Sequence, residues 1–303
     1  MSEGIKVLSL FDGISCARVA LERVGIEVEE YTAVEIDKYA TQVSRKNYPG
    51  IIRMGDIRYC HFAGGWYDLL IGGSPCQDLS IAKKDRKGLA GERSGLFWEY
   101  VRVLNEVKPK YFILENVNSM PKEAKQIITE ILGVEPIMIN AALVSAQNRK
   151  RLFWTNIPNV TQPEDRGILL KDILEDGSCD RLKSYCIDAN YFKGGKIGGT
   201  HQSSTRNYTI RVGQIGKGGQ ADSIYSPDGK SVNLSANGGG RGQKTGLYAV
   251  RQIIRKLTPI ECERLQGLPD NYTEGVSNTQ RYKCLGNAFN VDVIAHILNN
   301  LGL

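Results

Sequence analysis

Residues 6–16 read KVLSLFDGISC, an apolar run that ends in a turn containing Gly13. The run has the length and composition of a buried strand, and the glycine lets a tight turn lead into a helix. Similar strands and amphipathic helices alternate along the first half of the chain. This alternation predicts an α/β fold, a doubly wound and mostly parallel sheet with helices on both faces. Expected strands span residues 6–10, 29–34, 68–71, 111–114, 135–139 and 152–155, and expected helices span residues 16–24, 38–47, 95–107 and 121–132.

A last helical stretch, residues 291–301, follows a long glycine-rich segment. We expect this helix to pack back on the sheet, which makes the first domain discontinuous. The predicted first domain is residues 1–165 completed by 284–303. Residues 166–283 are predicted to form a smaller second domain.

The composition of the 303 residues, 41% hydrophobic and 24% charged, is that of an ordinary soluble globular chain. No apolar run approaches the length that spans a bilayer, and the first residues do not resemble a leader, so a cytoplasmic protein is expected. The seven cysteines contain no CxxC pair and the three histidines are isolated. Neither a disulfide framework nor a metal site is therefore expected.

Positive charge is concentrated between residues 166 and 256. This segment has 15 lysines and arginines against 7 aspartates and glutamates, a net charge of +8, in a chain whose total is +6. It also holds 16 of the 33 glycines. Cations on a loop-rich scaffold are suited to contacting the phosphates of a polyanion. The alternative is a flexible solvated insertion, against which the five tyrosines of the segment argue.

Three short motifs follow successive expected strands. They are GGSPCQ at 72–77, ENV at 115–117 and QNRKR at 147–151. Ligands on parallel sheets bind beyond the carboxyl ends of the strands, so a thiol, a carboxyl group and two guanidinium groups are expected to meet there. Each group also has a plain structural reading: a buried Cys76, an acid at a helix N-terminus for Glu115, and a solvated basic edge strand for Arg149 and Arg151.

Two further motifs lie near the carboxyl end, RKLTPIECERLQG at 255–267 and LGNAF at 285–289. Together the five motifs resemble those of the DNA (cytosine-5) methyltransferase family, over residues 6–158 and 255–301. The resemblance implies a Rossmann-like class I methyltransferase fold, S-adenosylmethionine as the cofactor and double-stranded DNA as the partner. It further implies that residues 166–283 form a Gly-rich target-recognition domain. The small architecture resembles that of a bacterial or phage enzyme.

The resemblance also implies the role of each reacting group. The Cys76 thiolate adds to carbon 6 of cytosine, and carbon 5 then attacks the sulfonium methyl group. Glu115 contacts ring nitrogen 3. Arg149 and Arg151 hold the cytosine oxygen, the loop of the nucleophile and a nearby phosphate. The expected catalytic residues are Cys76, Glu115, Arg149 and Arg151.

The expected cofactor pocket is built around two acids. Glu35 closes the second strand, where a nucleotide-binding fold places an acceptor for ribose hydroxyls. Asp56 lies where the family recognises the adenine amino group. Ser15 and Cys16 depart from the family's first motif, and the full GxGxxG pattern is absent. The expected cofactor-binding residues are Phe11, Asp12, Gly13, Ile14, Glu35, Ile36, Asp56, Ile57, Pro75, Asn287 and Ala288.

A polar loop, residues 77–93, follows the nucleophile directly and reads QDLSIAKKDRKGLAGER. Polar loops of this length inside a compact domain are usually functional. A stacked cytosine has to be flipped out of the duplex before its ring can react, and this loop is the expected brace for the gap. The expected DNA-binding residues are Gln77, Ser80, Lys83, Lys84 and Arg86 in the loop, and Arg206, Arg211, Arg241 and Lys244 in the basic segment.

Three other functions compete with this reading. A tRNA cytosine methyltransferase has the same fold and core motifs. A catalytically silent DNA-binding homologue is expected to have lost a reacting group, whereas Cys76, Glu115 and Arg151 are all present. A nicotinamide oxidoreductase suits the sheet but not the incomplete glycine pattern. We expect a monomer without an obligatory protein partner.

Overall fold

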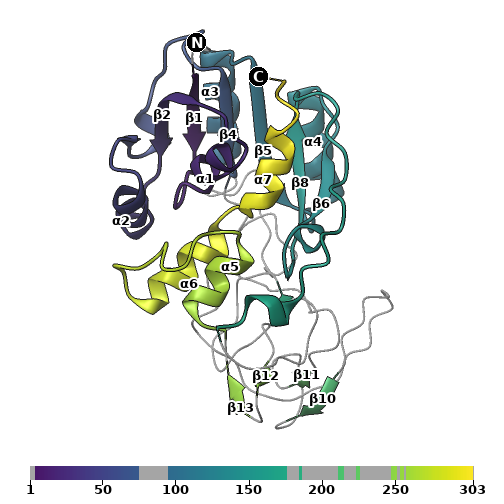
Figure 1. Cartoon of the computed structure of the whole chain (residues 1–303). Coiled ribbons are helices and arrows are strands. Elements are labelled where there is room, and N and C mark those ends of the chain that lie inside the picture. The colour runs from purple at the N-terminus through teal and green to yellow at the C-terminus, as the bar shows by residue number, and fades with distance from the viewer. Residues whose placement is uncertain are drawn as a thin grey trace. The chain divides into compact units, whose positions relative to one another are not determined.

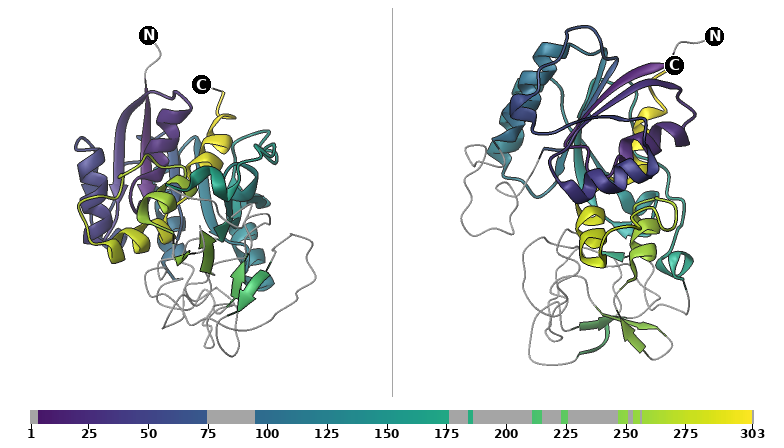
Figure 2. Two further views of the ribbon diagram at one scale, coloured as in Figure 1. Left: turned by 60° about the horizontal axis from the view of Figure 1, so that its bottom comes forward. Right: turned by 90° about the vertical axis from the view of Figure 1, so that its left-hand side faces the viewer.

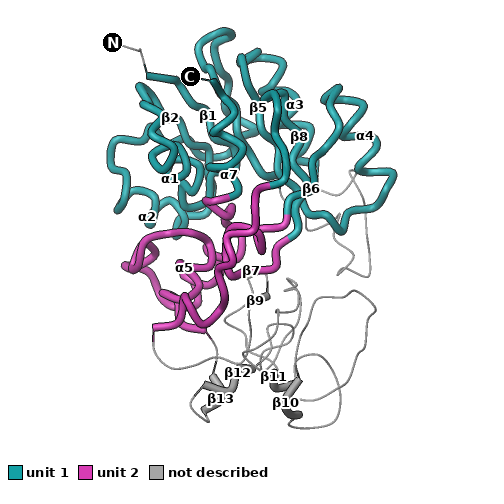
Figure 3. Tube along the Cα trace, turned by 45° about the vertical axis from the view of Figure 1, so that its right-hand side comes forward, with its two compact units in different colours: residues 1–139, 150–162, 293–303 teal, residues 140–149, 163–292 magenta. Residues whose placement is uncertain are grey.

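The computed structural model describes residues 4–74, 95–175 and 257–302, together with the backbone of five short strands between residues 184 and 255 (Figure 1). The chain divides into two compact units (Figure 3). Unit 1 comprises Met1–Ile139, Lys150–Gln162 and Val293–Leu303, and unit 2 comprises Asn140–Arg149 and Pro163–Asp292. Unit 1 is therefore discontinuous. The functional domain boundaries at residues 165 and 284 stay predictions.

Unit 1 contains a seven-stranded sheet in the order β3-β2-β1-β4-β5-β8-β6. The pairs β1–β2, β2–β3, β1–β4 and β4–β5 are parallel, and β5–β8 is antiparallel. The order reverses between β1 and β4, so this is the switch point where open α/β sheets bind ligands. The strands are β1 Ile5–Leu10, β2 Val28–Val34, β3 Ile52–Met54, β4 Leu69–Gly72, β5 Tyr111–Val117, β6 Ile137–Asn140 and β8 Lys150–Thr155.

Helices lie on both faces of this sheet, with α3 on one face and α1 on the other (Figure 2). On the α3 face, every second residue of a strand enters one apolar cluster, as the two-residue period of a strand requires. Leu8 and Leu10 of β1, for example, pack with Phe97 and Tyr100 of α3. The helices of unit 1 are α1 Cys16–Arg23, α2 Lys38–Asn47, α3 Leu96–Val107, α4 Lys122–Leu132 and most of α7 Val291–Leu298.

The described part of unit 2 is mainly helical. Helix α5, Pro259–Leu265, begins with a capping box in which Thr258 and Glu261 satisfy each other's backbone amides. Helix α6, Asn278–Asn287, begins at the cap Ser277. Short strands form a four-stranded sheet in the order β10-β11-β12-β13 and a pair, β7–β9. These strands are β7 Gln147–Asn148, β9 Ser184–Tyr185, β10 Arg211–Gln214, β11 Ser223–Tyr225, β12 Leu247–Val250 and β13 Ile253–Arg255.

The predicted mostly parallel α/β sheet is confirmed, with some differences at the ends of elements. Strand β5 continues to Val117, three residues past the expected end, and α7 ends at Leu298. Strand β3 was not among the expected ranges because three residues are too few to show a period. None of the helices within the described residues is long and apolar enough to cross a membrane.

Candidate active site

The turn after β1 has an unusual backbone. Phe11, Gly13 and Ser15 have φ angles of 56°, 60° and 64°, although only glycine adopts this left-handed region at no steric cost. Such strain persists only where neighbours fix the conformation, and it is common at functional sites. A Cβ atom at Gly13 would meet no atom of the described residues within 4 Å. Within this part of the chain, the turn therefore offers bare backbone that a ligand could approach.

Asp12 fixes this turn from the inside. Its carboxylate accepts hydrogen bonds from the Ser15 hydroxyl at 2.5 Å and the Tyr31 hydroxyl at 2.7 Å, and the residue is 5% exposed. Burial raises the pKa of Asp12, although these hydrogen bonds act to lower it. The side chain thus holds the turn, and cofactor contact by Asp12 stays a prediction.

Glu35 follows β2 and is bound to the same turn. One carboxylate oxygen accepts the Gly13 amide at 2.8 Å and the other accepts the Asp37 amide at 2.7 Å. Burial raises the pKa of Glu35 in spite of these two bonds. The next residue, Ile36, is 70% exposed. An acceptor carboxylate beside an exposed apolar side chain suits the ribose and base of a nucleoside.

Asp56 follows β3 and begins a short 3₁₀ helix, η1, Ile57–Tyr59. Its carboxylate accepts the Arg58 amide at 3.1 Å and pairs with the Arg58 guanidinium, which lowers the pKa of Asp56. Ile57 is 3% exposed and belongs to the apolar cluster under α3. Because β1, β2 and β3 are parallel neighbours, Gly13, Glu35 and Asp56 lie along one edge of the sheet. This donor and acceptor set fits the adenosine part of S-adenosylmethionine.

Glu115 lies inside β5 and faces Arg151 of β8. The two side chains form an ion pair at 2.8 Å, and they are 13% and 17% exposed, respectively. Helix α4 begins only at Lys122, so the alternative reading of Glu115 as an acid at a helix N-terminus is wrong. In the antiparallel register Glu115 opposes Phe153 and Val117 opposes Arg151. Glu115 and Arg151 are therefore diagonal neighbours on the same face of the sheet.

Next to Glu115, Asn116 connects β5 to the segment that leads to the expected nucleophile. Its amide donates to the Ser74 hydroxyl at 3.3 Å, and both residues are buried. Gly72, at the end of β4, is packed so closely that a Cβ atom there would lie 3.0 Å from the Leu10 carbonyl oxygen and 3.1 Å from the Tyr100 ring. The first glycine of the GGSPCQ motif is thus required by packing.

Arg149 has different surroundings from Arg151. It belongs to unit 2 and is 4% exposed, and its guanidinium donates to the carbonyls of Gly286 at 3.3 Å and Ala288 at 2.9 Å. Gly286 lies in the last turn of α6, where the helix dipole favours a cation. Arg149 therefore supports the backbone that carries two expected cofactor residues, Asn287 and Ala288.

Gln147, the first residue of the same motif, is fully buried in unit 2. Its amide donates to the Leu265 carbonyl and the Gln266 side chain, both at 3.2 Å. Gln266 in turn donates to the Leu285 carbonyl at 2.6 Å. Gln147, Arg149 and Gln266 thus all donate to backbone carbonyls at the ends of α5 and α6. The sequence analysis quoted both glutamines within motifs but gave neither a role, because a buried glutamine has no pattern that separates it from a surface one.

Several expected site residues lie outside the part of the chain that the structure describes, and Arg211 is described only by its backbone at the start of β10. Among the described residues, no group of three histidines, cysteines or acids could hold a metal ion. The residues outside the description are Pro75, Cys76, Gln77, Ser80, Lys83, Lys84, Arg86, Arg206, Arg241 and Lys244.

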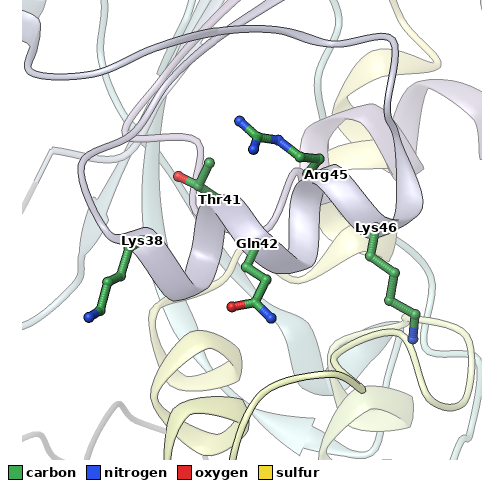
Figure 4. Close-up of a pocket in the computed structure, with 5 residues that line it drawn as sticks. All are labelled: Lys38, Thr41, Gln42, Arg45 and Lys46. Atoms are coloured by element: carbon green, nitrogen blue, oxygen red, sulfur yellow. The ribbon is translucent and has the colours of Figure 1, made fainter.

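An open cavity of about 600 Å³ lies along α2. Figure 4 shows Lys38, Gln42 and Lys46 pointing to one side of the helix, with Thr41 and Arg45 pointing to the other. Three of these five side chains are cationic, and none of them was expected to be a site residue.

The sequence was compared with protein families and with curated and solved proteins. The family model for C-5 cytosine-specific DNA methylases matches residues 5–303. The chain belongs to this family. The methylase is 33% identical to the type II methyltransferase M.HhaI of Haemophilus parahaemolyticus over 320 residues, which cover 99% of this chain and 94% of the relative. It is 29% identical to M.NlaX of Neisseria lactamica, over 98% and 96% of the two chains.

Solved structures agree with the family fold. The methylase superposes on the Entamoeba histolytica methyltransferase EhMeth with a TM-score of 0.63 at 17% identity, over 99% and 98% of the chains. The S. pombe Dnmt2 methyltransferase gives 0.62 at 17% identity, over 99% and 98%. The family model and the bacterial relatives confirm the predicted family and the DNA (cytosine-5) methyltransferase activity. They also confirm S-adenosylmethionine as the methyl donor. The nicotinamide reading is wrong.

Proposed function

We propose that this methylase flips a cytosine out of double-stranded DNA and methylates its carbon 5 through a covalent adduct with Cys76. The observation that carries the proposal is the Glu115–Arg151 ion pair between the neighbouring strands β5 and β8, beside the Asn116–Ser74 hydrogen bond. Ser74 lies two residues before Cys76 in the chain. A carboxyl group and a guanidinium group are thus fixed next to the segment that leads to the thiol.

The proposed chemistry divides one difficult step into two easier ones. The Cys76 thiolate donates an electron pair to carbon 6, and the displaced ring electrons make carbon 5 nucleophilic enough to take the methyl group. S-adenosylmethionine supplies that methyl group from its sulfonium centre. A base then removes the proton from carbon 5, and the returning electrons break the carbon–sulfur bond. Glu115 contacts ring nitrogen 3 and limits the negative charge there, while Arg151 holds Glu115 in place.

The adenosine part of the donor is proposed to lie along the edge formed by the turns after β1, β2 and β3. Glu35 accepts from the ribose, Ile36 packs against the base and Asp56 accepts the adenine amino group. Phe11, Gly13, Ile14, Ile57 and Pro75 complete the proposed pocket of unit 1. Cofactor contact by Asn287 and Ala288 of unit 2 stays a separate prediction. Asp12 is proposed to act through the turn that it holds.

The basic segment between residues 166 and 256 is proposed to read the DNA, and residues 77–93 to brace the flipped site. Each phosphate contact releases condensed counterions, so binding should weaken steeply with salt. The bacterial and phage relatives support a further proposal, that the methylase acts in a bacterial or phage-infected cell. We also propose that it acts as a monomer. Mass photometry of the purified protein tests the oligomeric state.

Bisulfite sequencing of host DNA after expression tests the activity and reads the target sequence at once. The adduct is tested with duplex DNA that carries 5-fluorocytosine at the target, because fluorine cannot leave as a cation in the last step. Enzyme and DNA should become covalently joined when S-adenosylmethionine is present. Cys76→Ala should bind DNA without forming the adduct. An adduct that persists in this variant would move the nucleophile elsewhere.

A further inference from the structure

Arg102 of α3 connects this helix to the turn that carries Asp56 and Ile57. Its guanidinium donates to the carbonyls of Ile57 at 2.8 Å and Cys60 at 3.1 Å, residues 45 and 42 positions earlier in the chain. Ile57 is the first residue of η1 and Cys60 is its C-cap, so Arg102 contacts both ends of this turn. Asp56 caps the same turn through its bond to the Arg58 amide.

The other side of the Arg102 guanidinium is held by α3 itself. Glu99 accepts at 2.8 Å and Glu106 accepts at 2.6 Å, and these acids lie one turn before and one turn after Arg102. Burial acts to raise the pKa of Glu106, but hydrogen bonds from Arg102 and His61 outweigh it and leave the pKa below its ordinary value. Glu106 therefore stays ionised at neutral pH. The guanidinium is fixed in one orientation before it meets the turn.

This arrangement is more than a surface ion pair. The planar guanidinium has five N–H donors in a rigid fork, and four hydrogen bonds use them on two acids and two carbonyls. The side chain is 28% exposed, so solvent screens part of the electrostatic interaction but the geometry remains defined. Neither a pattern nor a family motif in the sequence pointed to Arg102, because one arginine on a helix is most often a solvated residue.

We propose that Arg102 is a positioning residue for the methyl donor, which sets the Asp56–Ile57 turn in the conformation that recognises the adenine ring. This inference rests on the proposed pocket. Arg102 acts through the turn and needs no contact with the donor. A residue that only stabilised the fold would affect the free energy of unfolding but not the choice between adenine and a related base.

The experiment uses the full-length protein, with Arg102→Met to remove all donors at similar length and Arg102→Lys to keep the charge without the fork. Arg18→Met is the matched control, because Arg18 forms a helical ion pair with Glu22 at 3.1 Å on α1. Calorimetric titration measures the affinity for S-adenosylhomocysteine and for S-inosylhomocysteine, which has an oxo group in place of the adenine amino group. Urea unfolding of the ligand-free proteins measures stability.

We expect Arg102→Met to bind S-adenosylhomocysteine about tenfold more weakly, as the loss of charge-assisted hydrogen bonds implies. The preference for the adenosyl over the inosyl compound should shrink in the same variant and recover in part in Arg102→Lys. Arg18→Met should keep the wild-type preference. An unchanged preference in Arg102→Met, with or without a lower unfolding midpoint, would overturn the positioning role. Failure of the wild type to bind either compound would instead overturn the proposed pocket.

Discussion

Arg149 and Arg151 are two residues apart in one motif, yet they serve different parts of the molecule. Side chains two positions apart on an extended chain share a face, which led to the expectation of a joint role. In the structure, Arg151 pairs with the Glu115 carboxylate in unit 1, whereas Arg149 donates to two backbone carbonyls in unit 2. The chain changes unit between them. Residue type and spacing alone therefore do not separate a reacting group from a supporting one.

The partners suggest what each arginine contributes. A carboxylate held by a guanidinium forms a charged pair whose carboxylate can contact the substrate ring. Carbonyls at the end of α6 are neutral acceptors whose own hydrogen bonds would be lost if Arg149 were removed. Buried groups left without a partner cost about 1–3 kcal/mol each. We therefore expect substitutions at the Arg151–Glu115 pair to lower mainly the methylation rate. Substitution of Arg149 should lower mainly the free energy of unfolding.

The largest effect is expected at the partner of Arg151. Glu115→Gln should lower the single-turnover methylation rate by about 10²–10⁴-fold, because a positioned acid typically contributes that much. Binding to duplex DNA, followed by fluorescence anisotropy, should change little. Glu123→Gln, an exposed acid in the first turn of α4, is the matched control. A Glu115→Gln rate near that of the control would remove Glu115 from the chemistry.

A smaller effect, on stability, is expected at Arg149. Arg149→Met keeps most of the side-chain volume but leaves the Gly286 and Ala288 carbonyls without this donor. The free energy of unfolding in urea should fall by about 2–4 kcal/mol. Arg151→Met should cost clearly less stability while it lowers the methylation rate. Equal losses of stability and of activity in the two variants would contradict the different roles of Arg149 and Arg151.

Two buried tyrosines of unit 1 test more sharply whether the hydrogen-bond partner determines how much stability a substitution costs. Tyr31 donates to Asp12 at 2.7 Å, whereas the buried hydroxyl of Tyr100 has no hydrogen-bond partner among the residues that the structure describes. Tyr31→Phe should cost about 1–2 kcal/mol, and Tyr100→Phe should be neutral or slightly stabilising. Equal costs in urea unfolding would mean that ring packing, not the hydroxyl, dominates at both positions.

The smallest expected effect is a pH dependence that comes from Asp12. Burial raises its pKa, so the folded state binds this proton more tightly than the unfolded state does. The contribution of Asp12 to stability is then greatest at low pH and declines as pH rises from the ordinary carboxyl range through the raised pKa. Asp12→Asn should flatten the stability profile in that window. A profile that is identical in the two proteins would contradict the raised pKa.

The sequence predicted the sheet well because buried parallel strands and amphipathic helices have strong periods. It correctly placed Glu35 after β2. It expected Glu115 just after a strand, whereas Glu115 lies inside β5. A strand that continues past its apolar run gives no signal in the sequence at its end. It assigned no role to Gln147 and Gln266, although both lie in quoted motifs, and it did not single out Arg102. These side chains are defined by backbone carbonyls far away in the chain, and such partners exist only once the fold has formed.

Unit 1 is completed by residues 293–303, which lie far along the chain from most of its sheet. Val293, Ile294, Ile297 and Leu298 are buried, and the Leu301 carbonyl accepts the Tyr111 hydroxyl at 3.3 Å. A ribosome that adds about 5–20 residues per second needs roughly 6–26 seconds to pass from residue 163 to residue 292. For that time the nascent sheet lacks the apolar side chains of α7. We therefore expect the apolar face of the sheet that α7 covers to stay exposed on the growing chain until residues 293–301 have been synthesised.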